Sequence, residues 1–372
     1  MSNKFVAIIA AAIMLTISVC MIVLPKSDFS ENENRVLQKL PEFSGERLVS
    51  GEFTDEIENY INDHFPGRDA FVSIKGNFQK AIGYREMNET FIAGNRLLQH
   101  IKEPKTGNFI SKVNRLVGNL DDSEATVRLM VVPTDAGVYN ELLPQNAPDV
   151  VDEEAKISEI YDGVSCEGID ILSALIEEKD NGNNLFYNLD HHWTYYGAYI
   201  GYKTYMESLG MTPGTLEDIP HKVVSEEFRG TLYSKVLIGS MPSDSITAVD
   251  FTGMNLTVTN VDKNEVRDTY YYEEFLNKKD KYCYFGGGNP GKMIIENPDA
   301  TYDREVLVVK DSFANSLIPF LIGDFKKVHI IDPRYYVRHI SDCVVDDENI
   351  TDVLILYNLD SLSTNNGIIK LK

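Results

Sequence analysis

Residues that could carry out a reaction gather in two short segments of the 372-residue chain. The first segment is Asp190-His191-His192-Trp193, which holds two of the seven histidines and the only tryptophan. The second is Lys310-Asp311-Ser312-Phe313, where a serine follows a run of apolar residues. A serine nucleophile needs a general base, and that base needs a carboxylate to orient it. The two segments together contain these three groups, in Ser312, His192 and Asp190.

The sequence around Ser312 predicts that it follows a buried strand and begins a helix. Residues 306–309 are all apolar, and SFANSLIPFLIGDF (312–325) is short enough for one crossover helix. The hydroxyl would then be exposed at the sheet edge. The N–H groups of Ser312 and Phe313 would point outward, where they could stabilise an oxyanion. The alternative is a serine that only caps the helix, which is common.

The proposed base and its carboxylate lie two positions apart in the sequence. If the chain is extended from Asp190 to His192, both side chains point the same way and the carboxylate can sit beside the imidazole. Thr194 is a favourable N-cap for the helix TYYGAYIGYKTYMESLG, which Gly210 would end. Asp190 and His192 therefore belong to a loop before a helix, where functional side chains are often presented.

Two other interpretations of the histidine pair stay open on local grounds. One is a metal site, but adjacent histidines point in different directions, and zinc sites usually use spacings such as H-x-x-x-H. A third ligand at a recognisable spacing is missing from the sequence, so a distant His221 or an aspartate would have to contribute. The other interpretation is a structural pair beside a buried tryptophan. We predict the serine–histidine–aspartate arrangement and no metal site.

The N-terminus contains an uncharged apolar segment, Phe5 to Leu24. As a helix it would rise about 1.5 Å per residue and span roughly 30 Å, the thickness of a membrane's hydrocarbon core. Lys4 on the short flank favours an N-terminus inside and export of the rest. A cleaved signal peptide is the alternative, but its apolar region is usually about 7–15 residues long. We therefore predict an uncleaved membrane anchor in residues 1–28 and an extracytoplasmic catalytic domain in residues 29–372.

The composition argues against one class of partner. The 57 acidic and 35 basic residues give a formal charge of −22, whereas nucleic acid binding needs clustered lysines and arginines. Outside the apolar segment, Cys166, Cys283 and Cys343 form neither a disulfide framework nor a zinc pattern. We expect them to be core residues or residues without a special role.

The apolar runs predict an α/β fold with a parallel sheet flanked by helices. Strand, helix and strand around Ser312 are typical of such a sheet. Residues 29–90 should form a lead-in whose helical part, 52–82, is broken by a turn at His64–Arg68. Residues 221–300 should form irregular β structure over the sheet. The expected buried strands are residues 127–132, 306–309, 328–331 and 353–357.

The two segments together resemble the DHHW family, which belongs with the alginate O-acetyltransferase-like proteins of the SGNH-hydrolase class. The resemblance rests on DHHWT before a Gly-Ala-Tyr helix, and on KDSFANSLIPFL followed by IIDPRYY. SENENRVLQKLPEF, EIENYINDHFPGRDAF, MVVPTDAGVYNELLP and YFGGGNPGKMIIENP are also similar, so the likeness covers nearly all of residues 29–360. It implies an SGNH-hydrolase-like (flavodoxin-like) parallel sheet.

The resemblance implies a role for each residue of the predicted triad. Ser312 would be the nucleophile, His192 the general base and Asp190 its orienting partner. His191 occupies the variable middle position of the motif and should not be the base. The class usually has Gly-Asp-Ser at the serine, whereas this chain has Lys310 in place of the glycine, which bears on the oxyanion geometry.

Two further residues are candidates for contacts with substrate. Enzymes of this class use an asparagine as an oxyanion donor, and Asn289 in Gly-Gly-Gly-Asn-Pro is the candidate here. A plain turn is the alternative for that stretch. Arg334 could lie at another strand's carboxyl end and contact substrate, or it could pair with a buried carboxylate.

The activity implied by the resemblance is acetyl transfer on the outer side of a bacterial cytoplasmic membrane. An acetyl group would pass through Ser312 to a hydroxyl of an exported polysaccharide or cell-wall glycan, with no cofactor. A multi-spanning membrane acyltransferase would supply the acetyl donor, and residues 5–24 would hold the domain beside it. An acetyl esterase with the same three residues is one alternative. A non-catalytic glycan-binding envelope protein is another.

Overall fold

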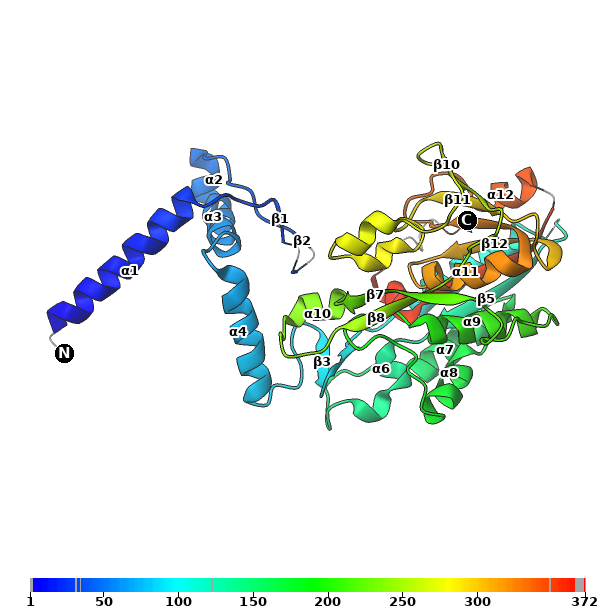
Figure 1. The fold of residues 1–372 in the computed structure, drawn as a ribbon, viewed down its shortest axis with the longest axis horizontal. Coiled ribbons are helices and arrows are strands. Elements are labelled where there is room, and N and C mark those ends of the chain that lie inside the picture. The colour runs from blue at the N-terminus through cyan, green and yellow to red at the C-terminus, as the bar shows by residue number, and fades with distance from the viewer. Residues whose placement is uncertain are drawn as a thin grey trace. The chain divides into compact units, whose positions relative to one another are not determined.

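The computed structural model describes residues 3–371 except residues 31, 34, 122, 348 and 365–370. The chain forms two compact units, which are coloured along the sequence in Figure 1. The first comprises Met1–Tyr84 and Tyr233–Met241, and the second comprises Arg85–Leu232 and Pro242–Lys372. The candidate residues all belong to the second unit.

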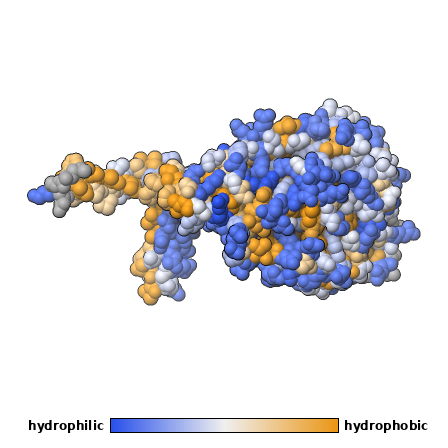
Figure 2. Space-filling view, turned by 90° about the horizontal axis from the view of Figure 1, so that it is seen from below, coloured by the Kyte–Doolittle hydropathy of each residue, from blue (hydrophilic) through white to orange (hydrophobic). Residues whose placement is uncertain are grey.

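The first unit begins with the apolar helix α1 (Asn3–Val23). Its residues Lys4–Val23 are long and apolar enough to cross a membrane, and none of them is buried. Figure 2 shows apolar side chains along this helix. A helix of this length and composition near the N-terminus can be an anchor or a signal sequence.

Three helices follow α1, and the last two of them confirm the predicted helical stretch with its interruption. Helix α3 (Glu52–Asp63) ends just before His64, and α4 (Arg68–Ala81) begins after the predicted turn. The short helix α2 (Gly45–Ser50) was not predicted, although Ser44 caps its start and Gly51 ends it in the left-handed conformation. The strands β1 (Phe29–Ser30) and β2 (Arg35–Val36) pair antiparallel before it.

The second unit is built on an eight-stranded sheet with the order β10-β9-β11-β13-β12-β14-β5-β6. Neighbouring strands from β13 to β6 are parallel, whereas β11, β9 and β10 add an antiparallel extension. The strands are β5 (Thr126–Val132), β6 (Glu167–Gly168), β9 (Thr257–Asn260), β10 (Glu265–Arg267), β11 (Lys292–Glu296), β12 (Tyr302–Lys310), β13 (Phe325–Ile331) and β14 (Ile350–Asn358).

The predicted strands and the crossover helix are confirmed. The expected runs lie within β5, β12, β13 and β14, and α11 (Ala314–Asp324) connects β12 to β13. The prediction for residues 221–300 is wrong in its placement, because β9, β10 and β11 extend the edge of the sheet instead of lying over it. In the same region β7 (His221–Phe228) and β8 (Asp244–Val249) form a separate antiparallel pair.

The remaining elements of the second unit are helices and one hairpin. The hairpin pairs β3 (Thr90–Ala93) with β4 (Arg96–Gln99). The α-helices are α5 (Thr106–Gly118), α6 (Asp135–Val138), α7 (Glu153–Gly163), α8 (Ile171–Asp180), α9 (Tyr195–Ser208), α10 (Thr231–Val236, which continues into the first unit), α12 (Ser341–Asp346) and α13 (Leu359–Thr364). Short 3₁₀-helices are η1 (Asn140–Leu142), η2 (Glu273–Asn277) and η3 (Lys281–Tyr284).

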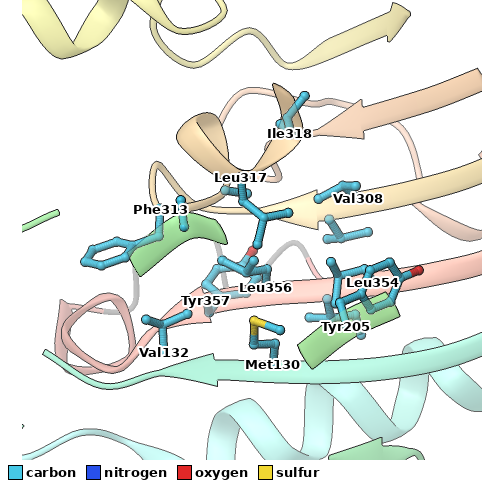
Figure 3. Packing of buried hydrophobic residues seen from close by; sticks show 14 of the residues in the cluster. Met130, Val132, Tyr205, Val308, Phe313, Leu317, Ile318, Leu354, Leu356 and Tyr357 are labelled. Carbon is cyan, nitrogen blue, oxygen red and sulfur yellow. The ribbon is translucent and has the colours of Figure 1, made fainter. Parts of the chain in front are cut away.

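Helices pack on both faces of the parallel strands. Side chains alternate along a strand, so Leu354 and Leu356 of β14 face one side and Tyr357 the other. Figure 3 shows the first side, where Tyr205 of α9 and Leu317 of α11 pack with residues of β5, β12 and β14. On the other side the ring of Tyr357 lies 5.6 Å from that of Phe109 in α5.

The strand register brings several loops to one edge of the sheet. Lys310 at the end of β12 pairs with Leu356, and Asn358 at the end of β14 pairs with Val132. Because these strands are parallel, the loops that follow them meet at the same edge. Strand β11 runs the other way, and its first residue Lys292 pairs with Ile331 at the end of β13. The residues before β11 therefore reach this edge too.

Candidate active site

Ser312 lies in the turn between β12 and α11, as the sequence predicts. Its side chain does not cap the helix. The N-cap position of α11 is Phe313, and no side chain accepts a hydrogen bond there. The Ser312 hydroxyl instead lies 2.9 Å from Nε2 of His192. Ser312 is partly exposed, whereas His192 is only 4% exposed, so the serine is the accessible member of the pair.

Asp190 and His192 lie side by side, but for a different reason from the predicted one. The segment is not extended: it bends between Phe186 and Trp193, which form an isolated antiparallel bridge. Asp190 Oδ1 accepts a hydrogen bond from the backbone N–H of His192 at 3.0 Å and lies 2.6 Å from its ring Nδ1. This is a local turn closed by an aspartate side chain, which such residues often form.

The other carboxylate oxygen of Asp190 is held by Thr231. The backbone N–H of Thr231 donates to Oδ2 at 2.8 Å, and its hydroxyl donates at 3.0 Å. A Cβ atom at Gly230 would overlap this carboxylate, so only glycine allows the approach. Sequence reasoning missed both residues, because their contact with Asp190 spans 41 positions and follows no motif.

Asp190 is suited to stay ionised although it is 1% exposed. Burial by itself would raise the pKa of its carboxyl group. The nearby histidines His192 and His191, together with hydrogen bonds from His192 and Thr231, outweigh burial and hold this pKa well below its usual range. A carboxylate is therefore present to orient the ring of His192.

The ring of His192 is also fixed from its face. Tyr282 of η3 stacks on it, with ring centroids 3.7 Å apart and planes 10° apart. The Tyr282 hydroxyl lies within hydrogen-bond distance of Ser316 Oγ, at 3.0 Å, and of the backbone oxygen of Ser312, at 3.3 Å. Tyr282 thus contacts both the imidazole of His192 and the turn that carries Ser312.

Trp193 supports the same turn. Its ring N–H donates to the backbone oxygen of Phe313 at 2.9 Å, and the tryptophan is fully buried. The four residues Asp190 to Trp193 therefore place a carboxylate beside an imidazole and support the turn that carries Ser312.

His191 has a different environment from His192. Its Nδ1 contacts the hydroxyl of Thr231, and its ring lies 3.9 Å from that of His192. Ligand atoms of Asp190, His191 and His192 lie within 4.8 Å of one another, as a metal site would require. However, Asp190 and Ser312 already occupy both ring nitrogens of His192. In this arrangement both ring nitrogens of His192 are engaged, so a metal would have to displace one of these contacts.

The backbone N–H of Phe313, predicted to point outward as an oxyanion donor, is already engaged. It donates to Oδ1 of Asp311 at 2.9 Å. Oδ2 of Asp311 accepts from the backbone N–H of Asn358 at 2.7 Å and from the Ser361 hydroxyl at 2.6 Å. The sequence-based placement of this N–H is thus corrected: the buried Asp311 uses it to hold the turn. Within the described residues, no hydrogen bond is found for the backbone N–H of Ser312.

Asn289 lies close to the serine turn. Gly286, Gly287 and Gly288 all have positive φ angles, so the stretch is a turn, and this turn leads to Asn289 at the edge of the sheet. Its side-chain oxygen accepts from Lys310 Nζ at 3.0 Å and from Asn315 Nδ2 at 3.3 Å. The turn therefore delivers an amide side chain beside residues that flank Ser312.

Arg334 follows β13 at the same edge of the sheet. Its guanidinium pairs with Asp332, with Nε 2.9 Å from Oδ1 and Nη2 2.5 Å from Oδ2. Asp332 is fully buried, whereas the Arg334 side chain is 23% exposed. Arg334 therefore pairs with a buried carboxylate, which is one of the two alternatives predicted from the sequence.

The comparisons with known proteins identify a family and a fold. The sequence model of the DHHW family, described as "DHHW protein", matches residues 100–331. No curated protein sequence matches the chain significantly. A solved DHHW family protein from Eubacterium siraeum is 22% identical with a TM-score of 0.64, covering 76% of this chain and 97% of that chain. Bacillus cereus PatB1, solved with a sulfonyl adduct, is 18% identical with a TM-score of 0.64, covering 76% and 98%. At these identities the structural likeness concerns the fold.

Proposed function

The chain belongs to the DHHW family, and we propose that it is a membrane-anchored O-acetyltransferase of the SGNH-hydrolase type. It transfers acetyl groups to hydroxyls of an exported polysaccharide or cell-wall glycan. The observation that carries this proposal is the continuous contact from Asp190 through His192 to Ser312, at 2.6 Å and 2.9 Å. Such a series of contacts is what a serine nucleophile requires.

In the first step Ser312 takes the acetyl group from a donor ester. Nδ1–H of His192 donates to Asp190, which leaves the lone pair of Nε2 directed at the Ser312 hydroxyl. Nε2 accepts the hydroxyl proton while Oγ forms a bond to the acetyl carbon. The carbon–oxygen bond to the donor then breaks, and His192 returns the proton to the departing alkoxide. Asp190 stabilises the transient imidazolium.

In the second step a glycan hydroxyl attacks the acetyl-serine. His192 takes the proton of that hydroxyl, the sugar oxygen bonds to the acetyl carbon, and the bond to Ser312 Oγ breaks with return of the proton. Water in place of the glycan would make the protein an acetyl esterase. The same three residues serve both reactions, so the acceptor decides between them.

The negative oxygen of each tetrahedral intermediate needs hydrogen-bond donors. The backbone N–H of Ser312 and the side-chain amide of Asn289 are the donors that the geometry supports best. The N–H of Phe313 could contribute only by sharing its bond with Asp311. Arg334 would contact substrate only with the part of its guanidinium that Asp332 leaves accessible.

The location of the reaction follows from α1. An uncleaved α1 would hold the catalytic unit at the outer face of the membrane. A multi-spanning membrane acyltransferase would carry the acetyl group across the bilayer, and the donor would reach Ser312 there. The three side chains need no cofactor for either step.

The experiment is intact-mass spectrometry of the full chain in detergent with 4-nitrophenyl acetate as donor. Native protein and Ser312→Ala are compared with and without glycan oligomers. One acetyl group on the native chain alone, lost faster with glycan than with water, is expected of a transferase. Loss to water alone would make the protein an esterase. Acetylation of Ser312→Ala at the native rate, or of neither protein, would overturn the proposal.

A sulfonyl fluoride gives a second measurement of the same nucleophile. The solved PatB1 carries a sulfonyl adduct, and sulfonyl fluorides react with activated hydroxyl groups. We expect one adduct on the native chain, none on Ser312→Ala and a much slower reaction in His192→Gln, because the base is lost.

A further inference from the structure

Lys310 stands two residues before Ser312, at the end of β12, and its side chain is buried. Only 1% of the lysine side chain is exposed. Because side chains alternate along a strand, Lys310 faces the opposite side from its neighbour Val309 in β12. A buried ammonium group is costly unless other groups pair with it and accept its hydrogen bonds. Its partners therefore indicate what the side chain does.

Two groups surround the ammonium of Lys310. Nζ donates to Oδ1 of Asn289 at 3.0 Å and lies 3.8 Å from Oδ2 of Asp332. Burial lowers the pKa of Lys310 to about 8, Asp332 opposes this shift, and Arg334 adds to it. The lysine therefore remains mainly charged at neutral pH.

The contact with Lys310 determines which way the amide of Asn289 points. An ammonium group has hydrogens to donate and no acceptor, so the oxygen of Asn289 must face it. Asn315 Nδ2 donates to the same oxygen at 3.3 Å, and is itself held by the backbone oxygen of Gly288 at 3.2 Å. The amide nitrogen of Asn289 is consequently turned away from Lys310. Among the described residues, no hydrogen bond is found for this nitrogen.

We propose that Lys310 is a positioning residue for acyl transfer: it holds the amide of Asn289 so that the amide N–H donates to the oxyanion formed on Ser312. Two residues hold the side chain of Asn289: Lys310, which precedes Ser312 in the chain, and Asn315, which follows it. Lys310 stands where the Gly-Asp-Ser block of the SGNH class has its glycine. The inference rests on the proposed function, since it needs a tetrahedral intermediate at Ser312.

The test is a double-mutant cycle with the full chain in detergent, using acetylation of Ser312 by 4-nitrophenyl acetate. Lys310→Met keeps the aliphatic stem and removes the donor, and Asp332 retains Arg334 as its partner. We expect Lys310→Met and Asn289→Ala each to lower kcat by at least about tenfold with KM within about threefold. In the Asn289→Ala background, Lys310→Met should change kcat by less than about threefold.

A second lysine variant shows whether the loss of kcat comes from the lost contact with Asn289 or from the loss of any partly buried positive charge. Lys327 of β13 is 21% exposed and lies 3.4 Å from Glu305 and 3.6 Å from Asp347. Lys327→Met should leave kcat unchanged even where it lowers the unfolding temperature. An equal loss of kcat in both lysine variants would overturn the inference.

Asn289→Asp tests the amide donor without disturbing the fold. The carboxylate can still accept from Lys310, but it has no N–H to donate, so kcat should fall as far as in Asn289→Ala. The inference is overturned by native kcat in Asn289→Asp, by native kcat in Lys310→Met, or by the same factor for Lys310→Met in both backgrounds. If acetylation still depends on Ser312, any of these three results overturns the inference about Lys310 alone. If acetylation does not depend on Ser312, the proposed function is overturned together with the inference.

Discussion

The imidazole of His192 and the phenol ring of Tyr282 lie face to face, 3.7 Å apart and 10° from parallel. This contact restricts tilting of the imidazole, while the contact with Asp190 restricts its rotation in the ring plane. The same tyrosine contacts the backbone oxygen of Ser312, so one side chain touches both the imidazole of His192 and the turn that carries Ser312. If His192 acts as the base, a small displacement of its ring would lower the rate of acetyl transfer.

Tyr282→Leu should therefore lower the rate of Ser312 acetylation by about 2- to 12-fold, because the stacked ring contributes about 0.5–1.5 kcal/mol. Tyr282→Phe keeps the ring and should stay within about threefold of the native rate. The measurement is nitrophenolate release by both variants at matched folded fractions. Equal rates in Tyr282→Leu and the native chain would show that stacking does not position the base.

Gly230→Ala should reduce the acetylation rate by about 10²- to 10³-fold, because its Cβ would displace the Asp190 carboxylate from His192. Gly118→Ala in α5 is the control, since a Cβ there meets nothing within 4 Å. Rates and unfolding temperatures of both variants should be measured together. A fully active Gly230→Ala would contradict the role given to Asp190.

The two adjacent histidines should respond very differently to substitution. His192→Gln should lose about 10²- to 10⁴-fold in rate, the range for a general base, whereas His191→Gln should stay within about tenfold. Chelation with EDTA should leave the native rate unchanged. Loss of activity in EDTA that added Zn²⁺ restores would instead support a metal bound by this segment.

A buried acid pair beside the end of β5 should make stability depend on pH. Burial raises the pKa of Asp135 to about 8 and that of Glu153 to about 7. Among the described residues, Oδ2 of Asp135 has no hydrogen-bond partner, so no hydrogen bond to this oxygen favours the ionised form. Because the folded chain binds these protons more tightly, their stabilisation is complete below about pH 4 and is lost as the pH rises through 7 to 8.

Asp135→Asn should therefore gain stability relative to the native chain between pH 5 and 7.5, by up to about 1.4 kcal/mol per pH unit. The free energy of unfolding in urea measures this difference. Asp180→Asn, an exposed aspartate on α8, should show no such trend. A constant difference between Asp135→Asn and the native chain would mean that Asp135 is ionised throughout.

Several features could be predicted because they depend on neighbours in the sequence. The apolar run of β12 and the helix-forming residues after it placed Ser312 at a strand end, and Thr194 with Gly210 marked the limits of α9. Asp190 and His192 are close in the chain, so their contact was predicted correctly although the backbone between them bends and is not extended. The apolar length of α1 was likewise visible in the composition.

Only the tertiary structure decided how these pieces act together. The hydrogen bond between His192 and Ser312 joins residues 120 positions apart, and the bond between Asp190 and Thr231 joins residues 41 apart. The antiparallel entry of β11 brought Asn289 to Lys310, and the buried Asp311 took the N–H of Phe313. Local sequence sets strand and helix because those depend on nearby residues. Which donor meets which acceptor depends on strand order, register and side-chain direction, which are fixed only when distant segments pack.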